Sequence, residues 1–345
     1  MKTIRIGIVG AGQNACKVHI PKLQSIAGVE ILEIANRSVE SGQAVAERFK
    51  IPRVRADWRE VVLSKDVDAV LIGTWPYLHC EVACLALNSG KHVLCEARMS
   101  MDEEEAREML RTSRENPRCV AQLVPSPFTL RIDKTVSQYL EQDKLGKPLY
   151  FHLDYQLGRV PPAQGPAHWR RNAKYSGKNI MVLGIAYESI LRWFGPAEWA
   201  SAEARVFNDA FLDPDSGKME KTEIPDYLSV QMRMKTGVQG TFLISEAGLH
   251  AGPPSLKILG ERGTLHYRFA PDGELQFASQ NDRDAKTVII PPGDEGRWRA
   301  EEEFVNCIRG METVNYTTFE TGLQYMRFTE AVNRGFKNNG ARITL

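Results

Sequence analysis

A glycine loop directly after an apolar strand constrains this chain more than any other feature. Isoleucines alternate along residues 3–9, and the segment runs straight into Gly10-Ala11-Gly12-Gln13-Asn14-Ala15. In such a loop the first glycine permits a tight turn, the second lets the backbone approach a pyrophosphate, and the small third residue lets helix pack on strand. The next helix offers free amides and a positive dipole end to phosphates. The loop therefore predicts a dinucleotide site, with Gly10, Gly12, Gln13 and Asn14 among its cofactor-binding residues.

The first 125 residues alternate between short apolar strands and helices. This alternation is typical of a doubly wound parallel sheet, so the sequence predicts an α/β Rossmann domain over residues 1–125. Ser100 and Glu103 predict a capping box, in which the serine oxygen accepts from one end amide and the glutamate covers the amide of the cap. The expected strands are 3–9, 31–35, 68–73, 92–95 and 119–124, and the expected helices include 14–25, 38–49 and 78–89.

The pattern changes after residue 125. Residues 235–237 and 261–263 are typical of turns between antiparallel neighbours. One long helix, at 180–193, interrupts the strands, and two helices at 301–309 and 319–338 close the chain. The sequence thus predicts an α+β domain with an open, mostly antiparallel sheet over residues 126–318, and its expected strands are 150–156, 200–206, 227–234, 237–246, 256–259 and 264–268.

Charge and composition exclude several classes of function. Among 345 residues, 44 Lys and Arg stand against 43 Asp and Glu, and no basic tract predicts a nucleic-acid partner. No run reaches the ~18 apolar residues of a membrane span, and no signal peptide is recognisable, so we expect a cytoplasmic protein with no membrane partner. The six cysteines lack zinc-ligand spacing, so we expect free thiols and no metal.

The residues after the second expected strand bear on the choice of cofactor. NAD sites usually place Asp or Glu there to bind the ribose hydroxyls, but Glu33 lies inside the strand. The strand ends instead at Asn36-Arg37-Ser38, where arginine supplies charge and a planar face and serine a hydroxyl. This set favours the 2′-phosphate of NADP. NAD stays the alternative, with Arg37 then a solvated loop charge.

Three stretches resemble the glucose–fructose oxidoreductase/inositol dehydrogenase (Gfo/Idh/MocA) family. They are residues 7–12 with His19, residues 69–81 continued by 90–96, and the chain's end, with Phe304, Ile308 and Gly310 followed by 321–323 and 330–331. The resemblance implies a nicotinamide cofactor, a sugar-like or cyclitol-like substrate, and a homo-oligomer (dimer or tetramer) formed through the sheet face. It also implies that a C-terminal helical segment, residues 319–345, returns to the first domain.

The same resemblance assigns further residues to the cofactor. His79 and Glu96 match positions beside the nicotinamide half, although His79 has an alternative as a helix-start residue satisfied by backbone. Thr74 and Trp75 follow the third expected strand, and the Trp75 ring is suited to stack on the cofactor or to cover the strand end. His19 is expected to be structural.

Departures from the family pattern fall on the groups that usually move protons. The family's Glu-Lys-Pro run is here Glu96-Ala97-Arg98, so its lysine is replaced by Ala97. The usual aspartate and histidine at the start of the long helix fall on Val182 and Ala186. Because oxidation of a secondary alcohol needs a base for the hydroxyl proton, the chemistry must use other residues or be absent.

Three residues are candidate replacements, namely His168, Tyr187 and Glu188. Tyr187 and Glu188 follow the empty histidine position, but the alternative is that Tyr187 packs and Glu188 pairs with Arg192 one helical turn later. The candidate substrate-binding residues are Arg98, Trp169, Arg170 and Asn179. Two of them have alternatives, since Arg98 is equally suited to be a surface or helix-side charge and Asn179 to cap a helix.

Two functions of different classes follow from these patterns. The first is an NAD(P)-dependent oxidoreductase, or a redox-neutral sugar enzyme, with non-standard acid–base residues. The second is a catalytically degenerate NAD(P)-binding sensor or regulatory protein. The polar groups retained around residues 168–171 favour the enzyme.

Overall fold

The computed structural model describes residues 3–157, 169–213, 216–269 and 273–345. The chain divides into two units. The first holds Met1–Pro125 with Arg299–Met326, and the second holds Ser126–Trp298 with Arg327–Leu345. Among the described residues, no helix is long and apolar enough to cross a membrane.

The apolar strands of the first unit form a six-stranded parallel sheet. They are β1 (Ile4–Val9), β2 (Val29–Ala35), β3 (Arg53–Arg55), β4 (Ala69–Ile72), β5 (His92–Cys95) and β6 (Ala121–Leu123). All four residues of β4 are buried, as expected for a strand covered on both faces. The strand order is β3-β2-β1-β4-β5-β6, so the winding direction reverses between β1 and β4, where such sheets open a crevice. The predicted doubly wound sheet is therefore confirmed.

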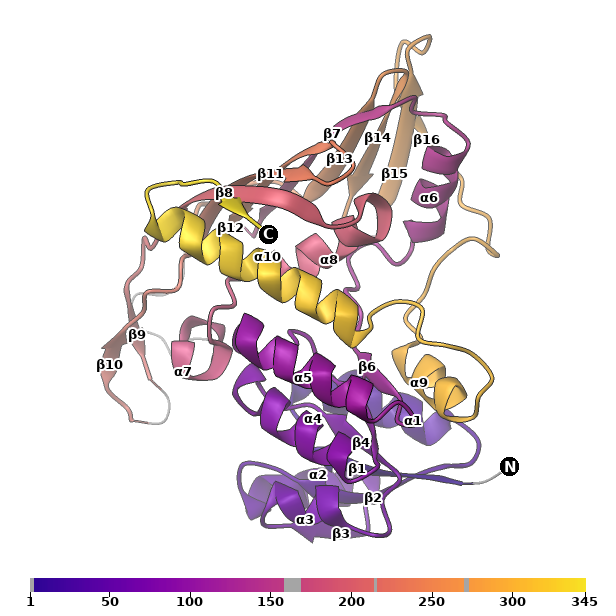
Figure 1. Cartoon of the computed structure of the whole chain (residues 1–345), viewed down its shortest axis with the longest axis vertical. Coiled ribbons are helices and arrows are strands. Elements are labelled where there is room, and N and C mark those ends of the chain that lie inside the picture. The colour runs from indigo at the N-terminus through magenta and orange to yellow at the C-terminus, as the bar shows by residue number, and fades with distance from the viewer. Residues whose placement is uncertain (1–2, 158–168, 214–215, 270–272) are drawn as a thin grey trace. The chain divides into compact units, whose positions relative to one another are not determined.

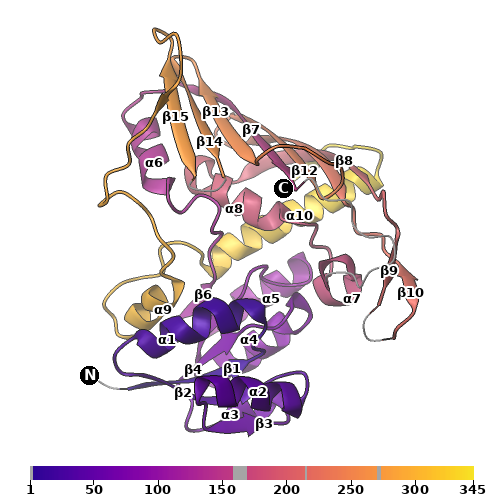
Figure 2. The ribbon, with the colours of Figure 1, turned by 180° about the vertical axis from the view of Figure 1, so that it is seen from behind.

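Helices connect and cover these strands (Figure 1). The predicted helix at 14–25 contains a π-helical turn, Ala15–His19, continued by α1 (Ile20–Ser25). Late in the sequence, α9 (Ala300–Ile308) packs against α1 and β5 and so belongs to the first unit (Figure 2). The remaining elements are α2 (Val39–Phe49), α3 (Trp58–Leu63), the 3-10 turn η2 (Pro76–Leu78), α4 (His79–Asn88) and α5 (Glu103–Glu115).

The capping box predicted at Ser100 and Glu103 is wrong by two residues. Asp102 caps α5 by accepting a hydrogen bond from Glu105 N at 3.0 Å, and the Glu105 carboxylate accepts from Met101 N at 2.9 Å. The Ser100 hydroxyl instead donates to the Asp102 carbonyl at 2.7 Å. The box is thus built on Asp102 and Glu105, since Asp is at least as good a cap as Ser.

The second unit is built on a nine-stranded, mostly antiparallel sheet, as predicted. The order is β16-β15-β14-β13-β7-β12-β11-β8-β17, and only β7 and β12 pair in parallel within the described sheet. A separate hairpin joins β9 (Ala210–Leu212) and β10 (Met219–Lys221). The sheet strands are β7 (Pro148–Gln156), β8 (Ala197–Arg205), β11 (Tyr227–Met234), β12 (Gln239–Ser245), β13 (Ser255–Gly260), β14 (Gly263–Arg268), β15 (Glu274–Ser279), β16 (Lys286–Thr287) and β17 (Ile343–Thr344).

Aromatic side chains hold two helices against this sheet. The helices are α8 (Leu183–Phe194) and the second half of α10 (Phe319–Lys337), which begins in the first unit and ends in the second. Phe151 of β7 stacks on Phe194, with ring centroids 5.5 Å apart, while Phe242 of β12 meets Phe328 edge-on at 6.3 Å. The unit also contains α6 (Asp133–Glu141), the 3-10 turn η3 (Trp169–Arg171) and α7 (Ala173–Ser176).

Candidate functional site

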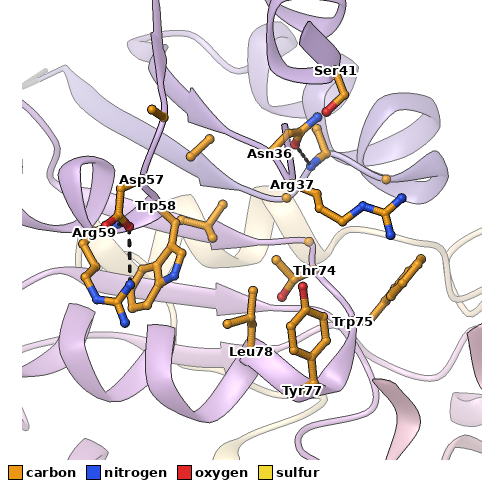
Figure 3. Close-up of a pocket in the computed structure, with 17 residues that line it drawn as sticks. Asn36, Arg37, Ser41, Asp57, Trp58, Arg59, Thr74, Trp75, Tyr77 and Leu78 are labelled. Carbon is orange, nitrogen blue, oxygen red and sulfur yellow. Dashed lines mark hydrogen bonds and ion pairs between the residues drawn. The ribbon is translucent and has the colours of Figure 1, made fainter. Parts of the chain in front are cut away.

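A pocket of about 650 Å³ opens where β1, β2 and β4 end (Figure 3). Its floor is the glycine loop, and residues after β2, β3 and β4 form its walls. This is the crevice at the carboxyl ends of the strands, next to the reversal of strand order, where α/β sheets bind ligands. The lining residues are Val9, Gly10, Ala11, Gly12, Ala35, Asn36, Arg37, Ser41, Ala56, Asp57, Trp58, Arg59, Gly73, Thr74, Trp75, Tyr77 and Leu78.

The glycine loop has the backbone that the sequence predicts. Gly10 has a φ of +80°, and a Cβ there would lie 2.5 Å from Thr74 Cγ2. By contrast, a Cβ on Gly12 would meet nothing closer than Gly73 O, at 3.7 Å. Ala15 is buried against Gly73, as its small size requires. Gly10 is therefore needed by the fold, whereas Gly12 leaves an open approach for a phosphate.

The three polar residues after β2 take different places. Asn36 Oδ1 accepts from Ala11 N at 2.7 Å and so fixes the glycine loop. Arg37 extends toward Trp75 on the side of the pocket away from Trp58, and its guanidinium carbon lies 5.7 Å from the centre of the Trp75 ring. Ser38 caps α2 by accepting from Ser41 N at 3.2 Å, and it is Ser41 that lines the pocket. Of the predicted trio, Asn36 and Arg37 thus line the pocket.

Glu33 has no access to this pocket. Its side chain is fully buried, with Oε2 2.9 Å from Arg55 Nε and Oε1 2.8 Å from an Arg53 nitrogen. Burial would raise the pKa of this carboxyl, but the two arginines and a Ser64 hydrogen bond lower it instead. Glu33 is therefore an internal ion-pair partner, and the prediction that it lies too early in the strand to bind ribose is consistent with its place.

The far wall of the pocket was missed from the sequence. Trp58 begins α3 after the short strand β3, and the centre of its ring lies 4.3 Å from the Arg59 guanidinium carbon. Asp57 caps α3 by accepting from Arg59 N at 2.9 Å. Trp58, Tyr77 and Leu78 enter the pocket from two separate elements (Figure 3). Aromatic rings with arginine side chains beside them are suited to stack on an adenine base.

A charged network lies on the other side of the glycine loop, where the predicted residue Glu96 follows β5. His19 is fully buried, with Nε2 2.8 Å from Glu96 Oε1 and Nδ1 2.5 Å from Glu301 Oε1. Asn14, one of the predicted loop residues, also donates to Glu96 Oε1. Burial alone would lower the pKa of His19, but the hydrogen bonds that its ring donates to both carboxylates raise it to about 9. His19 is therefore an imidazolium at neutral pH.

His79 has the alternative role that the sequence left open. Its ring is fully buried, with Nε2 3.0 Å from Thr74 O and Nδ1 2.9 Å from Arg98 O. Burial lowers the pKa of this histidine. His79 thus fixes the backbone at Thr74, a pocket residue, and at Arg98, whose own side chain is 2% exposed.

Comparison with known proteins identifies the family of this chain. Residues 4–123 match the GFO/IDH/MocA oxidoreductase family with an NAD-binding Rossmann fold, and residues 134–266 match the GFO/IDH/MocA C-terminal domain. An oxidoreductase of Rhizobium meliloti, itself uncharacterised, is 32% identical over 351 residues, which covers 97% of both chains. The chain belongs to the GFO/IDH/MocA family. Its first unit is an NAD-binding Rossmann domain.

Two further proteins are similar to this GFO/IDH/MocA member. Inositol 2-dehydrogenase of Salmonella typhimurium is 26% identical over 192 residues, which cover 50% of this chain and 56% of that protein. Levoglucosan dehydrogenase, solved in complex with NADH and L-sorbose, superposes with a TM-score of 0.83 at 20% identity, over 99% of this chain and 98% of that one. The second likeness shows a shared fold.

Ala97, Val182 and Ala186 are the residues that the sequence comparison with the family pattern predicts at the proton-transfer positions. Tyr187 beside them is fully buried, stacks on Phe328 with centroids 3.7 Å apart, and accepts from Ala197 N at 2.7 Å. Burial raises the pKa of this phenol further above its ordinary value. The alternative that Tyr187 packs is confirmed.

The Glu188 side chain is also fully engaged in contacts within the second unit. Its carboxylate accepts from Ser126 N at 3.0 Å and from Arg192 Nη2 at 2.7 Å, and Arg192 also reaches Asp133 at 2.6 Å. All of the Glu188 side chain is buried. The predicted alternative, a pair with Arg192 one turn away, is confirmed, and the acid–base role of Glu188 gains no support from these contacts.

The remaining candidates lie around α7. Trp169 and Arg170 form η3, with the Arg170 guanidinium carbon 4.6 Å from the Trp169 ring centre, and both are half-buried. Asn179 is buried and donates to Ser176 O at 2.7 Å, whereas α8 begins after Val182. His168 lies outside the described residues. Among those described, no cluster of three His, Cys, Asp or Glu could hold a metal ion.

Proposed function

We propose that this protein is an NAD(P)-dependent oxidoreductase acting on a sugar-like or cyclitol-like substrate with non-standard acid–base residues. One observation carries the proposal, namely the pocket at the ends of β1, β2 and β4 with Gly10 and Gly12 at its floor. The substrate class is supported by the similarity to inositol 2-dehydrogenase and levoglucosan dehydrogenase. A bound nicotinamide dinucleotide would supply the hydride acceptor or donor.

The residues of this chain fit such a group. The loop at Gly12 and the amides of the following helix would bind the pyrophosphate, since no Cβ blocks their approach. Trp58 and Trp75 would hold the adenine end, and Glu96 would face the nicotinamide half. We further propose that Arg98, Trp169, Arg170 and Asn179 serve the substrate, and that His168 supplies the acid–base group.

We propose NADP as the preferred cofactor, because Arg37 lines the pocket, whereas Glu33 is buried in an ion pair with Arg55 and cannot bind the ribose. Arg37→Gln removes the positive charge while keeping a polar side chain. The ratio of the dissociation constants for NADPH and NADH should then shift by ten-fold or more toward NADH, since a charge-assisted bond to phosphate is worth roughly 1.5–3 kcal/mol. Arg59→Gln, on the opposite wall, is the matched control. An unchanged ratio in Arg37→Gln would refute the preference.

Turnover is tested by following absorbance at 340 nm across a panel of sugars and cyclitols with both cofactors. His168→Ala should abolish the rate on any accepted substrate, whereas Tyr187→Phe should retain it, because that phenol is buried against Phe328. Full activity of His168→Ala would refute the assigned role.

A sensor or regulatory protein is the second candidate. It is favoured by the loss of all three proton-transfer groups at Ala97, Val182 and Ala186 and by the structural use of Glu188. This candidate predicts tight cofactor binding by calorimetry, no hydride transfer across the panel, and a partner protein bound in a cofactor-dependent manner. Measurable turnover on a panel substrate would refute it.

We also propose that the protein is cytoplasmic and forms a dimer or tetramer through its large sheet. Light scattering coupled to size-exclusion chromatography measures the assembly. A strictly monomeric mass at micromolar concentration would refute this part.

A further inference from the structure

The network of Glu96, His19 and Glu301 has one open end. The His19 side chain is 0% exposed and that of Glu301 is 1% exposed, whereas Glu96 retains 15%. Both hydrogen bonds to the Glu96 carboxylate, from Asn14 and His19, reach Oε1. Within the described part of the chain, Oε2 of Glu96 has no hydrogen-bond partner. The network is thus closed on the Glu301 side and presents a carboxylate oxygen on the other.

The order of the strands indicates which half of the cofactor lies beside Glu96. Glu96 directly follows β5, and its amide donates to Ile72 O at 2.9 Å, so it stands at the carboxyl edge of the sheet. The pocket walls that follow β2 and β3 lie on one side of the reversal between β1 and β4, whereas β5 lies on the other side. In a doubly wound sheet the two halves of a dinucleotide lie on opposite sides of the reversal point. Glu96 therefore belongs to the nicotinamide half.

The network carries a net charge of −1 when its histidine is protonated and both carboxylates are ionised. The pKa of Glu96 is lowered despite burial, because His19 and Asn14 bind the ionised form. The oxidised nicotinamide ring is a cation and the reduced ring is neutral. A fixed negative charge in a partly buried site distinguishes these two forms, whereas bulk water would screen it.

We propose that His19 and Glu301 are positioning residues that hold the Glu96 carboxylate ionised and fixed in the nicotinamide half, where its charge favours the oxidised cofactor over the reduced one. This inference rests on the proposed site but does not need turnover. The π-helical turn at Ala15–His19 places the imidazole between two carboxylates that lie 205 positions apart in the sequence. Such turns recur at functional sites.

The experiment measures dissociation constants for NAD⁺ and NADH, or for the phosphorylated pair if it binds more tightly, by fluorescence and calorimetry. Glu96→Gln should weaken binding of the oxidised form about ten-fold more than that of the reduced form. Glu301→Gln should shift the ratio in the same direction by a smaller factor, because it neutralises the network further from the open end. His19→Gln should give an intermediate shift, because loss of the buried cation raises the pKa of Glu96 and leaves its carboxylate protonated part of the time.

Glu33→Gln is the matched control, because it makes the same substitution at a fully buried carboxylate paired with arginines in the same sheet. It should lower the melting temperature and leave the ratio unchanged. An unchanged ratio in folded Glu96→Gln, or equal shifts in Glu33→Gln and Glu96→Gln, would overturn the inference. Ratio shifts in a protein without turnover would support it while refuting the proposed enzyme. A wild-type protein that binds neither form would overturn both.

Discussion

The buried imidazolium of His19 should make the fold less stable as pH rises through neutrality. Its pKa is about 9 in the folded chain and about 6.5 when unfolded, so the folded state binds more protons between these values. The stabilisation is complete below pH 6.5 and is lost as pH rises through about 9. Each pH unit costs about 1.4 kcal/mol, so the free energy of unfolding should fall by about 2–3 kcal/mol from pH 6.5 to 8.5. Measurements should stop there, because burial raises the pKa of the Cys95 thiol and adds a further fall at higher pH.

Urea unfolding followed by circular dichroism at pH 6.5, 7.5 and 8.5 measures this fall. His19→Gln should remove it, because an amide retains one hydrogen bond but neither gains nor loses a proton in this pH range. His152→Gln, the same substitution at a half-buried histidine of β7, should retain it. A wild-type curve that is flat over this range, or a His19→Gln protein that keeps the full fall, would refute the charged network.

Four further substitutions distinguish effects on stability from effects on cofactor binding. Gly12→Ala should leave the melting temperature unchanged and weaken cofactor binding ten-fold or more by titration, whereas Gly10→Ala should lower both, because its Cβ would meet Thr74. Tyr187→Phe should lower the free energy of urea unfolding by about 1–3 kcal/mol, because it leaves a buried backbone amide without an acceptor. Glu188→Gln should cost about 3 kcal/mol in the same assay, because it leaves a buried arginine without its full countercharge. Stability equal to wild type in either second-unit variant would contradict these contacts.

The parts of the molecule that could be predicted from the sequence are those with local signals. The glycine loop needs only a strand, a turn and a helix start within a dozen residues, and the structure has all three. β3 and the Trp58 wall could not be found this way. A three-residue strand, Arg53–Arg55, carries no readable alternation, and only its pairing with β2 makes it a strand.

The charged network could not be predicted, because its members come from segments far apart in the sequence. His19 was expected to be structural, and one of its partners, Glu301, lies on a late helix whose packing no local pattern reveals. Tyr187 became a candidate only through its place in the sequence. It is adjacent in sequence to the empty histidine position at Ala186, yet neighbours on a helix point about 100° apart, and Tyr187 faces Phe328 in the core.

The place of β7 in the large sheet also has a consequence for how the chain is made. Both of its neighbours, β12 and β13, follow it in sequence, and about 80 residues separate it from the nearer one. At about 5–20 residues per second, a ribosome leaves both edges of β7 unpaired for roughly 4–16 seconds. Unpaired strands of this kind recruit other chains, so β7 should be the segment for which a chaperone or slow translation matters most during biosynthesis.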